Sequence, residues 1–214
     1  MDHCSIAKIK EGELVGRLLL DQSRRWDILR LYGIPDDVLD FQQVNLKDVP
    51  GDPRDRAGDI DILLCAPSRP DAAIAIEVKR VNVDAKGLHG LMRHKKGVKQ
   101  ANRLERIGFS QVYLFEFVVV DSREKHNGQI SYAGAPTDLR HMIHRELSLR
   151  GLTARVGHVI FEFVQPMDYA PLNAGAPGTH GVFPKRLAEE VTQPVALTAW
   201  VAQKVARHVP SPAI

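Results

Sequence analysis

The sequence predicts an α/β protein with a mixed β-sheet, and three observations support this. Segments with helical periodicity alternate with short β-branched segments, in the order helix, strand, strand, helix, strand, helix, strand. Of the 214 residues, 44% are hydrophobic and 26% are charged, which is the balance of an ordinary globular protein. A chain of this length can bury a full hydrophobic core without disulfide bonds or structural metal ions. The sequence contains no internal repeat.

The first elements follow from local residue spacing. Residues 11–32 carry apolar side chains at helical spacing and are followed by a glycine and a proline, so they predict one long helix or two short ones. Residues 48–58 have turn composition and no apolar periodicity, so they predict a loop. Residues 60–65 and 73–81 are rich in β-branched side chains and flank a segment with two prolines, so they predict two neighbouring strands.

The later elements follow from the same signals. Residues 85–107 are rich in Lys and Arg and predict a basic helix, although three glycines within them are unfavourable for one. Residues 110–121 and 153–164 predict strands, and residues 136–150 predict a helix between them. Gly and Pro are dense in residues 166–184, which predicts a long loop, and one or two helices are expected after it.

The domain organisation and the compartment are also predicted. We expect a core domain in residues 1–165, and in residues 166–214 a Gly/Pro-rich loop and a C-terminal helical extension of the same domain. Cys4 and Cys65 show no zinc-binding spacing. The amino-terminal residues are charged, and no apolar run reaches the ~20 residues that span a bilayer, so we expect a cytoplasmic protein without a membrane partner.

Carboxylates interrupt the two apolar strands predicted in residues 58–81. Side chains alternate between the faces of a strand, so Glu77 and Lys79 share one face of their strand, and Asp61 lies on one face of the other. If the two strands pair, these three side chains converge on one point. A buried charge without a partner is costly, which favours a bound cation at that point. An ion-paired or solvated strand end is the competing interpretation.

A magnesium ion fits this pattern. Mg²⁺ takes oxygen ligands and is typically held by one or two carboxylates together with substrate phosphate, so Asp61 and Glu77 are candidate ligands. Lys79 could orient or deprotonate a water molecule and stabilise charge on the phosphate. The predicted chemistry is metal-assisted attack of water on a phosphodiester.

These residues resemble a known catalytic motif. Asp61, fifteen intervening residues and then Glu77-Val78-Lys79 are similar to the motif of the PD-(D/E)xK nuclease superfamily, which includes restriction endonucleases, Holliday junction resolvases, and repair and phage nucleases. Ile60 stands where the motif has its proline. The resemblance covers residues 11–120. It implies a restriction endonuclease-like αβββαβ core with a central mixed sheet flanked by helices, in which residues 41–46 supply the first strand.

The resemblance also implies a role for each site residue. Asp61, Glu77 and Lys79 become the catalytic residues, and the metal ligands become Asp61, Glu77 and the Val78 carbonyl. Members often place an acidic residue of the first helix near the metal; Glu13 is the best match, and Glu11 competes with it. The implied cofactor is Mg²⁺, for which Mn²⁺ is expected to substitute.

Positive charge is concentrated beside this motif. Nine Lys and Arg residues and only two acidic residues lie from residue 79 to residue 106, a local net charge of +7 in a chain whose total is +3. Such a patch is typical of binding to a phosphate backbone. The candidate nucleic-acid-binding residues are Arg93, Lys96, Lys99, Gln100 and Arg103. For any one of them a solvated helix face is the competing interpretation, and His94 is expected on phosphate or at the surface.

The sequence therefore predicts a metal-dependent nuclease that hydrolyses DNA, with endonuclease action expected. Three other functions stay open: a non-cleaving nucleic-acid-binding module of the same fold, an RNA-cutting or toxin-like nuclease, and a small-molecule enzyme unrelated to nucleic acid, which only the long loop of residues 166–184 favours. The expected partner is DNA, with RNA as the alternative. Many members of the superfamily dimerise to cut two strands, so a homodimer is also compatible with the resemblance.

Overall fold

The computed structural model describes residues 10–12, 15, 38–51, 58–84, 87–89, 91–121, 124–126, 129–131, 137–165 and 180–208. Glu11, Gly12 and Val15 are helical. The remaining described elements are, in chain order, β1 (Leu39–Asn45), the 3-10 turn η2 (Leu46–Asp48), β2 (Asp59–Ala66), β3 (Arg69–Asp84), β4 (Gly87–His89), α3 (Leu91–Ile107), β5 (Gln111–Asp121), β6 (Glu124–His126), β7 (Gln129–Ser131), α4 (Thr137–Glu146), β8 (Gly157–Gln165), β9 (His180–Arg186) and α5 (Val195–Ala206).

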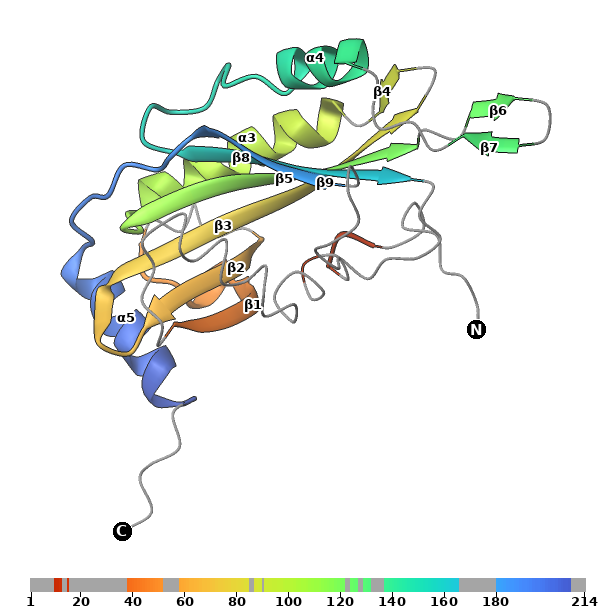
Figure 1. Ribbon diagram of the computed structural model, residues 1–214. Coiled ribbons are helices and arrows are strands. Elements are labelled where there is room, and N and C mark those ends of the chain that lie inside the picture. Colours follow the sequence, from red (N-terminus) through yellow and green to blue (C-terminus); the bar gives the residue numbers. More distant parts are fainter. Residues whose placement is uncertain are drawn as a thin grey trace.

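The strands form a mixed sheet, which confirms the predicted α/β class. In the described residues seven strands make one sheet in the order β1-β2-β3-β5-β8-β9, with β4 paired to the end of β3 (Figure 1). The central pairs β3/β5 and β5/β8 are parallel, whereas β1/β2, β2/β3 and β8/β9 are antiparallel. Strands β6 and β7 form a separate hairpin.

Apolar side chains cover both faces of the central strands, as expected for parallel strands with structure on either side. On one face, α3, α4 and α5 pack against the sheet; their buried contacts include Val98, Ile143 and Val201. On the other face, Ile76 and Phe115 pack in a second cluster that includes Val15 of the first helix. None of the helices in the described ranges is long and apolar enough to cross a membrane.

Three boundaries of the predicted elements are wrong: the start of the basic helix, the end of α4 and the start of β8. Residues 87–89, predicted as the start of the helix, form β4 and pair with residues 82–84 of β3; glycine disfavours helix, and a strand partner is adjacent. The helix α4 ends at Glu146 instead of residue 150, and β8 begins at Gly157 instead of residue 153. Between them the backbone makes turn hydrogen bonds within residues 149–156.

The prediction of a long loop for residues 166–184 is also wrong at its carboxyl-terminal end. Residues His180–Arg186 form the edge strand β9, which pairs with β8 in spite of Pro184. Proline lacks a backbone donor and is tolerated on an edge strand, because one side of that strand has no neighbour to bond. Residues 166–179 lie outside the described residues.

Candidate active site

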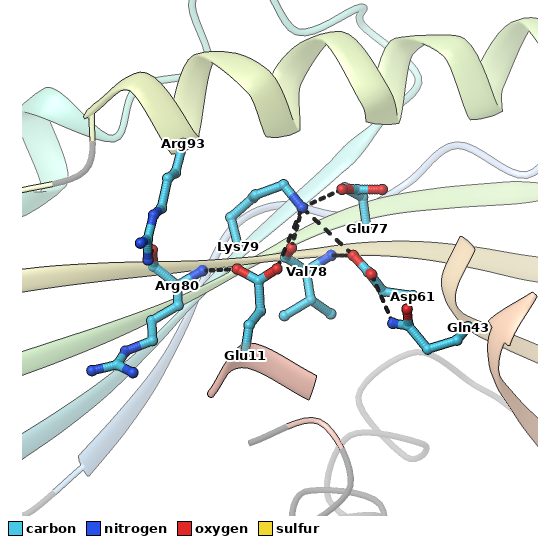
Figure 2. Close-up of polar contacts among 8 residues, drawn as sticks. All are labelled: Glu11, Gln43, Asp61, Glu77, Val78, Lys79, Arg80 and Arg93. Carbon is cyan, nitrogen blue, oxygen red and sulfur yellow. Dashed lines mark hydrogen bonds and ion pairs between the residues drawn. The ribbon is translucent and has the colours of Figure 1, made fainter. Parts of the chain in front are cut away.

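Two neighbouring strands bring the motif residues to one point (Figure 2). Asp61 is in the first half of β2, and the antiparallel register that sets Ile62 opposite Ile76 places Asp61 beside Glu77 of β3. The Nζ atom of Lys79 makes an ion pair with Glu77 Oε1 and lies 3.7 Å from Asp61 Oδ2. The convergence predicted from strand alternation is therefore confirmed.

Asp61 is held by two hydrogen bonds. Its Oδ2 atom accepts from the backbone N–H of Val78 at 2.7 Å, and its Oδ1 atom accepts from Gln43 Nε2 at 3.1 Å. Gln43 lies in β1 between two residues that pair with β2 on either side of Asp61, and its φ is 51°, in the left-handed region. Gln43 is not among the predicted site residues, because no sequence pattern indicates a left-handed residue inside a strand.

The first helix contributes Glu11 to the site. Glu11 Oε2 accepts a hydrogen bond of 2.7 Å from the backbone N–H of Arg80, and Glu11 Oε1 lies 3.7 Å from Lys79 Nζ. An acidic residue of this helix was expected here, with Glu13 preferred over Glu11. Glu13 lies outside the described residues, and Glu11 is the one whose position is described.

The charges of the site are unbalanced. Glu77 is only 1% exposed, and burial together with repulsion from Asp61 raises its pKa to about 8 in spite of the nearby Lys79. Burial opposes the charged form of Lys79, but the carboxylates of Glu77, Asp61 and Glu11 outweigh it and hold the lysine pKa above its ordinary value. Even with Glu77 protonated, the carboxylates of Glu11 and Asp61 outnumber the one ammonium group, which leaves an excess of negative charge.

The donor set fits a hard divalent cation. It consists of the carboxylates of Glu11, Asp61 and Glu77 and the Val78 carbonyl, all oxygen ligands of the kind that Mg²⁺ prefers. Glu77 Oε2 is buried and accepts no hydrogen bond from any described residue. As they stand, however, no three Asp, Glu, His or Cys side chains of the described ranges are arranged to hold one ion.

Helix α3 passes directly over Lys79. A Cβ atom at Gly97 would lie 2.6 Å from Lys79 Cγ and 2.9 Å from Leu114 Cδ1, closer than a side chain can approach. This contact explains a glycine in the middle of the helix, where glycine is otherwise unfavourable. Gly97 therefore sets how near the helix lies to the site.

The basic residues of α3 form a row beside the carboxylates. At one end Arg93 Nη1 donates to the backbone carbonyl of Arg80 at 3.4 Å. At the other end Arg103 Nη2 comes within 3.3 Å of the position of a Cβ at Gly58, next to the start of β2. Lys96 and Gln100 lie on the same side of the helix, between these ends. Lys99 is exposed and adjoins the row.

A second polar cluster, unidentified in the sequence, lies on the same face of the sheet. Glu116 of β5 is fully buried; its Oε1 atom is 2.8 Å from His94 Nδ1 of α3, and its Oε2 atom is 2.6 Å from His158 Nε2 of β8. The expectation that His94 lies at the surface or on phosphate is wrong, because the ring points toward the sheet to pair with Glu116. A buried carboxylate needs such partners.

The comparisons with known proteins give no further identification. No known family model matches the chain, and no curated protein matches it in sequence.

Proposed function

We propose that the protein is a Mg²⁺- or Mn²⁺-dependent endonuclease that hydrolyses phosphodiester bonds in DNA. The observation that carries the proposal is the meeting of Asp61, Glu77 and Lys79 at one buried point beneath the basic row of α3. The chain order of a first helix, β1, β2, β3, α3 and β5 is compatible with the restriction endonuclease-like αβββαβ core that the motif implies.

Asp61, Glu77 and the Val78 carbonyl would hold the metal, with Glu11 as the acidic residue of the first helix. A bound divalent cation would supply charge neutralisation at the phosphate and a more acidic water. The protein contributes the fixed orientation of its ligands: Asp61 is held from one side by Gln43 and from the other by the Val78 amide. Such supporting hydrogen bonds orient the oxygens that bind a metal.

Lys79 would act as a cation. Its pKa lies above the ordinary lysine value, so it keeps its proton at neutral pH and has no free lone pair with which to accept one. Of the two roles that the sequence allows, orientation of water with stabilisation of phosphate charge is therefore favoured over deprotonation of water. The pKa of Glu77, raised to about 8 in the absence of metal, leaves this carboxyl largely protonated at neutral pH, so a metal ion that binds there has to displace its proton.

The basic row of α3 would bind the backbone of the substrate. Arg93, Lys96 and Arg103 present cationic groups along one side of the helix, and contacts of this kind set affinity and position without reading sequence. Arg80 lies outside this row: it follows Lys79 in β3, so its side chain is on the opposite face of the strand, and its Nε atom donates to Asn82 Oδ1 at 3.1 Å. Burial and the charge of Arg93 hold the pKa of Arg80 below the ordinary arginine value.

A substrate panel tests the proposal. The full chain is incubated with supercoiled plasmid, labelled single-stranded DNA, branched DNA and RNA, each with Mg²⁺, with Mn²⁺ and with EDTA. Cleavage of DNA that requires the metal supports the proposal, and nicked or linear plasmid as first product indicates endonuclease action. Cleavage of RNA alone would favour the RNA-cutting alternative, and metal-independent binding without cleavage would favour the binding module; either result rejects the proposal.

A further inference from the structure

The ammonium group of Lys79 lies among the oxygens that would bind the metal. Its Nζ atom donates to the Val78 carbonyl at 2.6 Å, pairs with Glu77 Oε1, and lies 3.7 Å from both Asp61 Oδ2 and Glu11 Oε1 (Figure 2). These four oxygens come from the first helix, β2 and β3, and together they are the whole donor set named above. The lysine side chain is buried, so water does not screen these contacts.

We infer that Lys79 is an internal counter-ion of the metal-free site, and that a divalent cation binds only by displacing its ammonium group from the carboxylates. This inference rests on the proposed function, since it concerns the same metal site. Two cations cannot share a cluster of this size without strong repulsion in a buried environment. The displacement also accounts for the absence of a ready-made metal cluster in the described ranges: the oxygens are arranged around an ammonium group.

The surroundings of Lys79 define which part of it moves. The stem of the side chain is held beneath Gly97, where Lys79 Cγ occupies the space in which a Cβ would lie. The ammonium group and the last methylene are therefore the parts that are free to turn. A group displaced from the carboxylates but fixed at its stem stays beside the site, where it is available to a phosphate oxygen of the substrate.

The inference predicts that Lys79 weakens metal binding in the absence of nucleic acid. Mn²⁺ is titrated into the full chain by calorimetry for wild type, for Lys79→Met, which keeps the length of the stem but removes the charge, and for Arg93→Met. We expect Lys79→Met to bind Mn²⁺ at least about tenfold more tightly than wild type. Arg93→Met removes a neighbouring positive charge that lies outside the oxygen cluster, and we expect it to stay within about twofold of wild type.

Several outcomes overturn the inference. Equal or weaker Mn²⁺ binding by Lys79→Met would show that the ammonium group does not compete with the metal. Equal tightening in Lys79→Met and Arg93→Met would show a general effect of charge and no displacement. If binding is lost in Asp61→Asn but unchanged in Lys79→Met, only this inference fails; if no form of the protein binds Mn²⁺ or Mg²⁺, the proposed function fails with it.

A measurement on the wild-type side chain covers the case in which Lys79→Met does not fold. Protein labelled with ¹³C at the lysine Cε positions is titrated with Mg²⁺, and the Lys79 resonance is identified by its absence from Lys79→Arg. Displacement predicts that this resonance shifts as Mg²⁺ binds, while those of the exposed Lys95 and Lys99 stay in place. A Lys79 resonance that does not respond while Mg²⁺ binds contradicts the inference.

Discussion

Gln43 combines an unfavourable backbone conformation with a contact to the proposed metal ligand Asp61. Its φ of 51° is costly for a residue with a side chain, and its amide donates to Asp61 Oδ1. A residue kept in such a conformation beside a candidate site is typical of local strain that serves positioning. At Gln43 the effect of the backbone conformation on stability can therefore be measured separately from the effect of the side chain on metal binding.

Replacement of Gln43 by glycine is predicted to weaken metal binding without a comparable loss of stability. The substitution relieves the left-handed backbone but leaves Asp61 without its amide donor, so we expect Mn²⁺ affinity to fall by about 10- to 100-fold, as for other partners of metal ligands. The free energy of unfolding in urea should stay within about 1 kcal/mol of wild type. The matched control is Gln42→Gly, an exposed neighbour in ordinary strand conformation, whose metal affinity should not change. A Gln43→Gly variant with wild-type Mn²⁺ affinity would rule out the positioning role.

The close approach of α3 to β3 gives Gly97 an unusual role within its helix. Glycine to alanine in a helix normally stabilises a protein by about 1 kcal/mol. At Gly97 the new Cβ would meet Lys79 Cγ at 2.6 Å and Leu114 Cδ1 at 2.9 Å, so the helix must shift away from the sheet or Lys79 must leave its position.

We therefore predict that Gly97→Ala lowers the free energy of unfolding by about 1–3 kcal/mol and reduces metal-dependent cleavage. Lys99→Ala, at an exposed position of the same helix, should leave the free energy of unfolding unchanged or slightly raised. The measurements are urea denaturation and initial rates of plasmid cleavage. Stabilisation by Gly97→Ala would contradict the close approach of α3 to Lys79 Cγ.

The polar cluster of His94, Glu116 and His158 ties α3 to β5 and β8. Burial opposes ionisation of Glu116, but hydrogen bonds from His158 and His94 outweigh it and hold the carboxyl pKa below its ordinary value of 4.5. Because the pKa is lower in the folded state, the unfolded state binds more protons in acid. The contribution of Glu116 to stability is therefore present above the ordinary carboxyl pKa and is lost as the pH falls through the folded value.

Glu116→Gln is predicted to destabilise the protein by about 1–3 kcal/mol at pH 7, since the amide has one acceptor for two histidine partners. The difference in the free energy of unfolding between wild type and Glu116→Gln should narrow as the pH falls below 4.5, because the stabilising carboxylate of the wild type begins to be protonated. Urea denaturation at several pH values measures both effects, with the exposed Glu190→Gln as the control. A difference that widens in acid would show that Glu116 is not held ionised by its histidines.

The arrangement of charge over the whole molecule predicts how it binds DNA. The chain carries a net charge of +3, but residues from 79 to 106 carry +7, so DNA is expected to bind along α3 beside the candidate active site. Lys96→Ala and Arg103→Ala should each weaken binding to unrelated DNA sequences by the same factor. Each should also reduce, by about 1, the steepness with which the logarithm of the binding constant falls with the logarithm of salt concentration. Arg150→Ala removes an exposed arginine next to Gly151, which contacts α3 at Asn102 on the side of the helix away from Lys96 and Arg103, and should change neither quantity. Fluorescence anisotropy at several salt concentrations tests this prediction, and an unaltered slope in both α3 variants would place DNA elsewhere.

The parts of the fold and site that were predictable are those governed by local periodicity. Alternation along β2 and β3 indicated that Asp61, Glu77 and Lys79 share a face, because only the pairing of two adjacent strands had to be assumed. The edge strand β9 was missed because it is stabilised by pairing with β8, while its own residues and the segment before it have the composition of a loop.

The remaining features depend on contacts between segments distant in the sequence. The pairing of Glu116 with His94 and His158 joins residues separated by 22 and 42 positions, and no local spacing indicates it. The left-handed Gln43 and the close approach at Gly97 are likewise set by the neighbouring strand and helix. Tertiary context overrides local preference at these positions, and positions of this kind are often functional.

The most direct test of the central claim is the rate of plasmid cleavage with Mg²⁺ for wild type, Glu77→Gln and Glu190→Gln side by side. Glu77→Gln preserves the shape of the side chain but removes a carboxylate that would bind the metal, so we predict a loss of at least about 100-fold. Glu190→Gln removes an exposed carboxylate and should cut at the wild-type rate. Metal-dependent cutting that persists unchanged in Glu77→Gln would contradict the assignment of the active site to Asp61, Glu77 and Lys79.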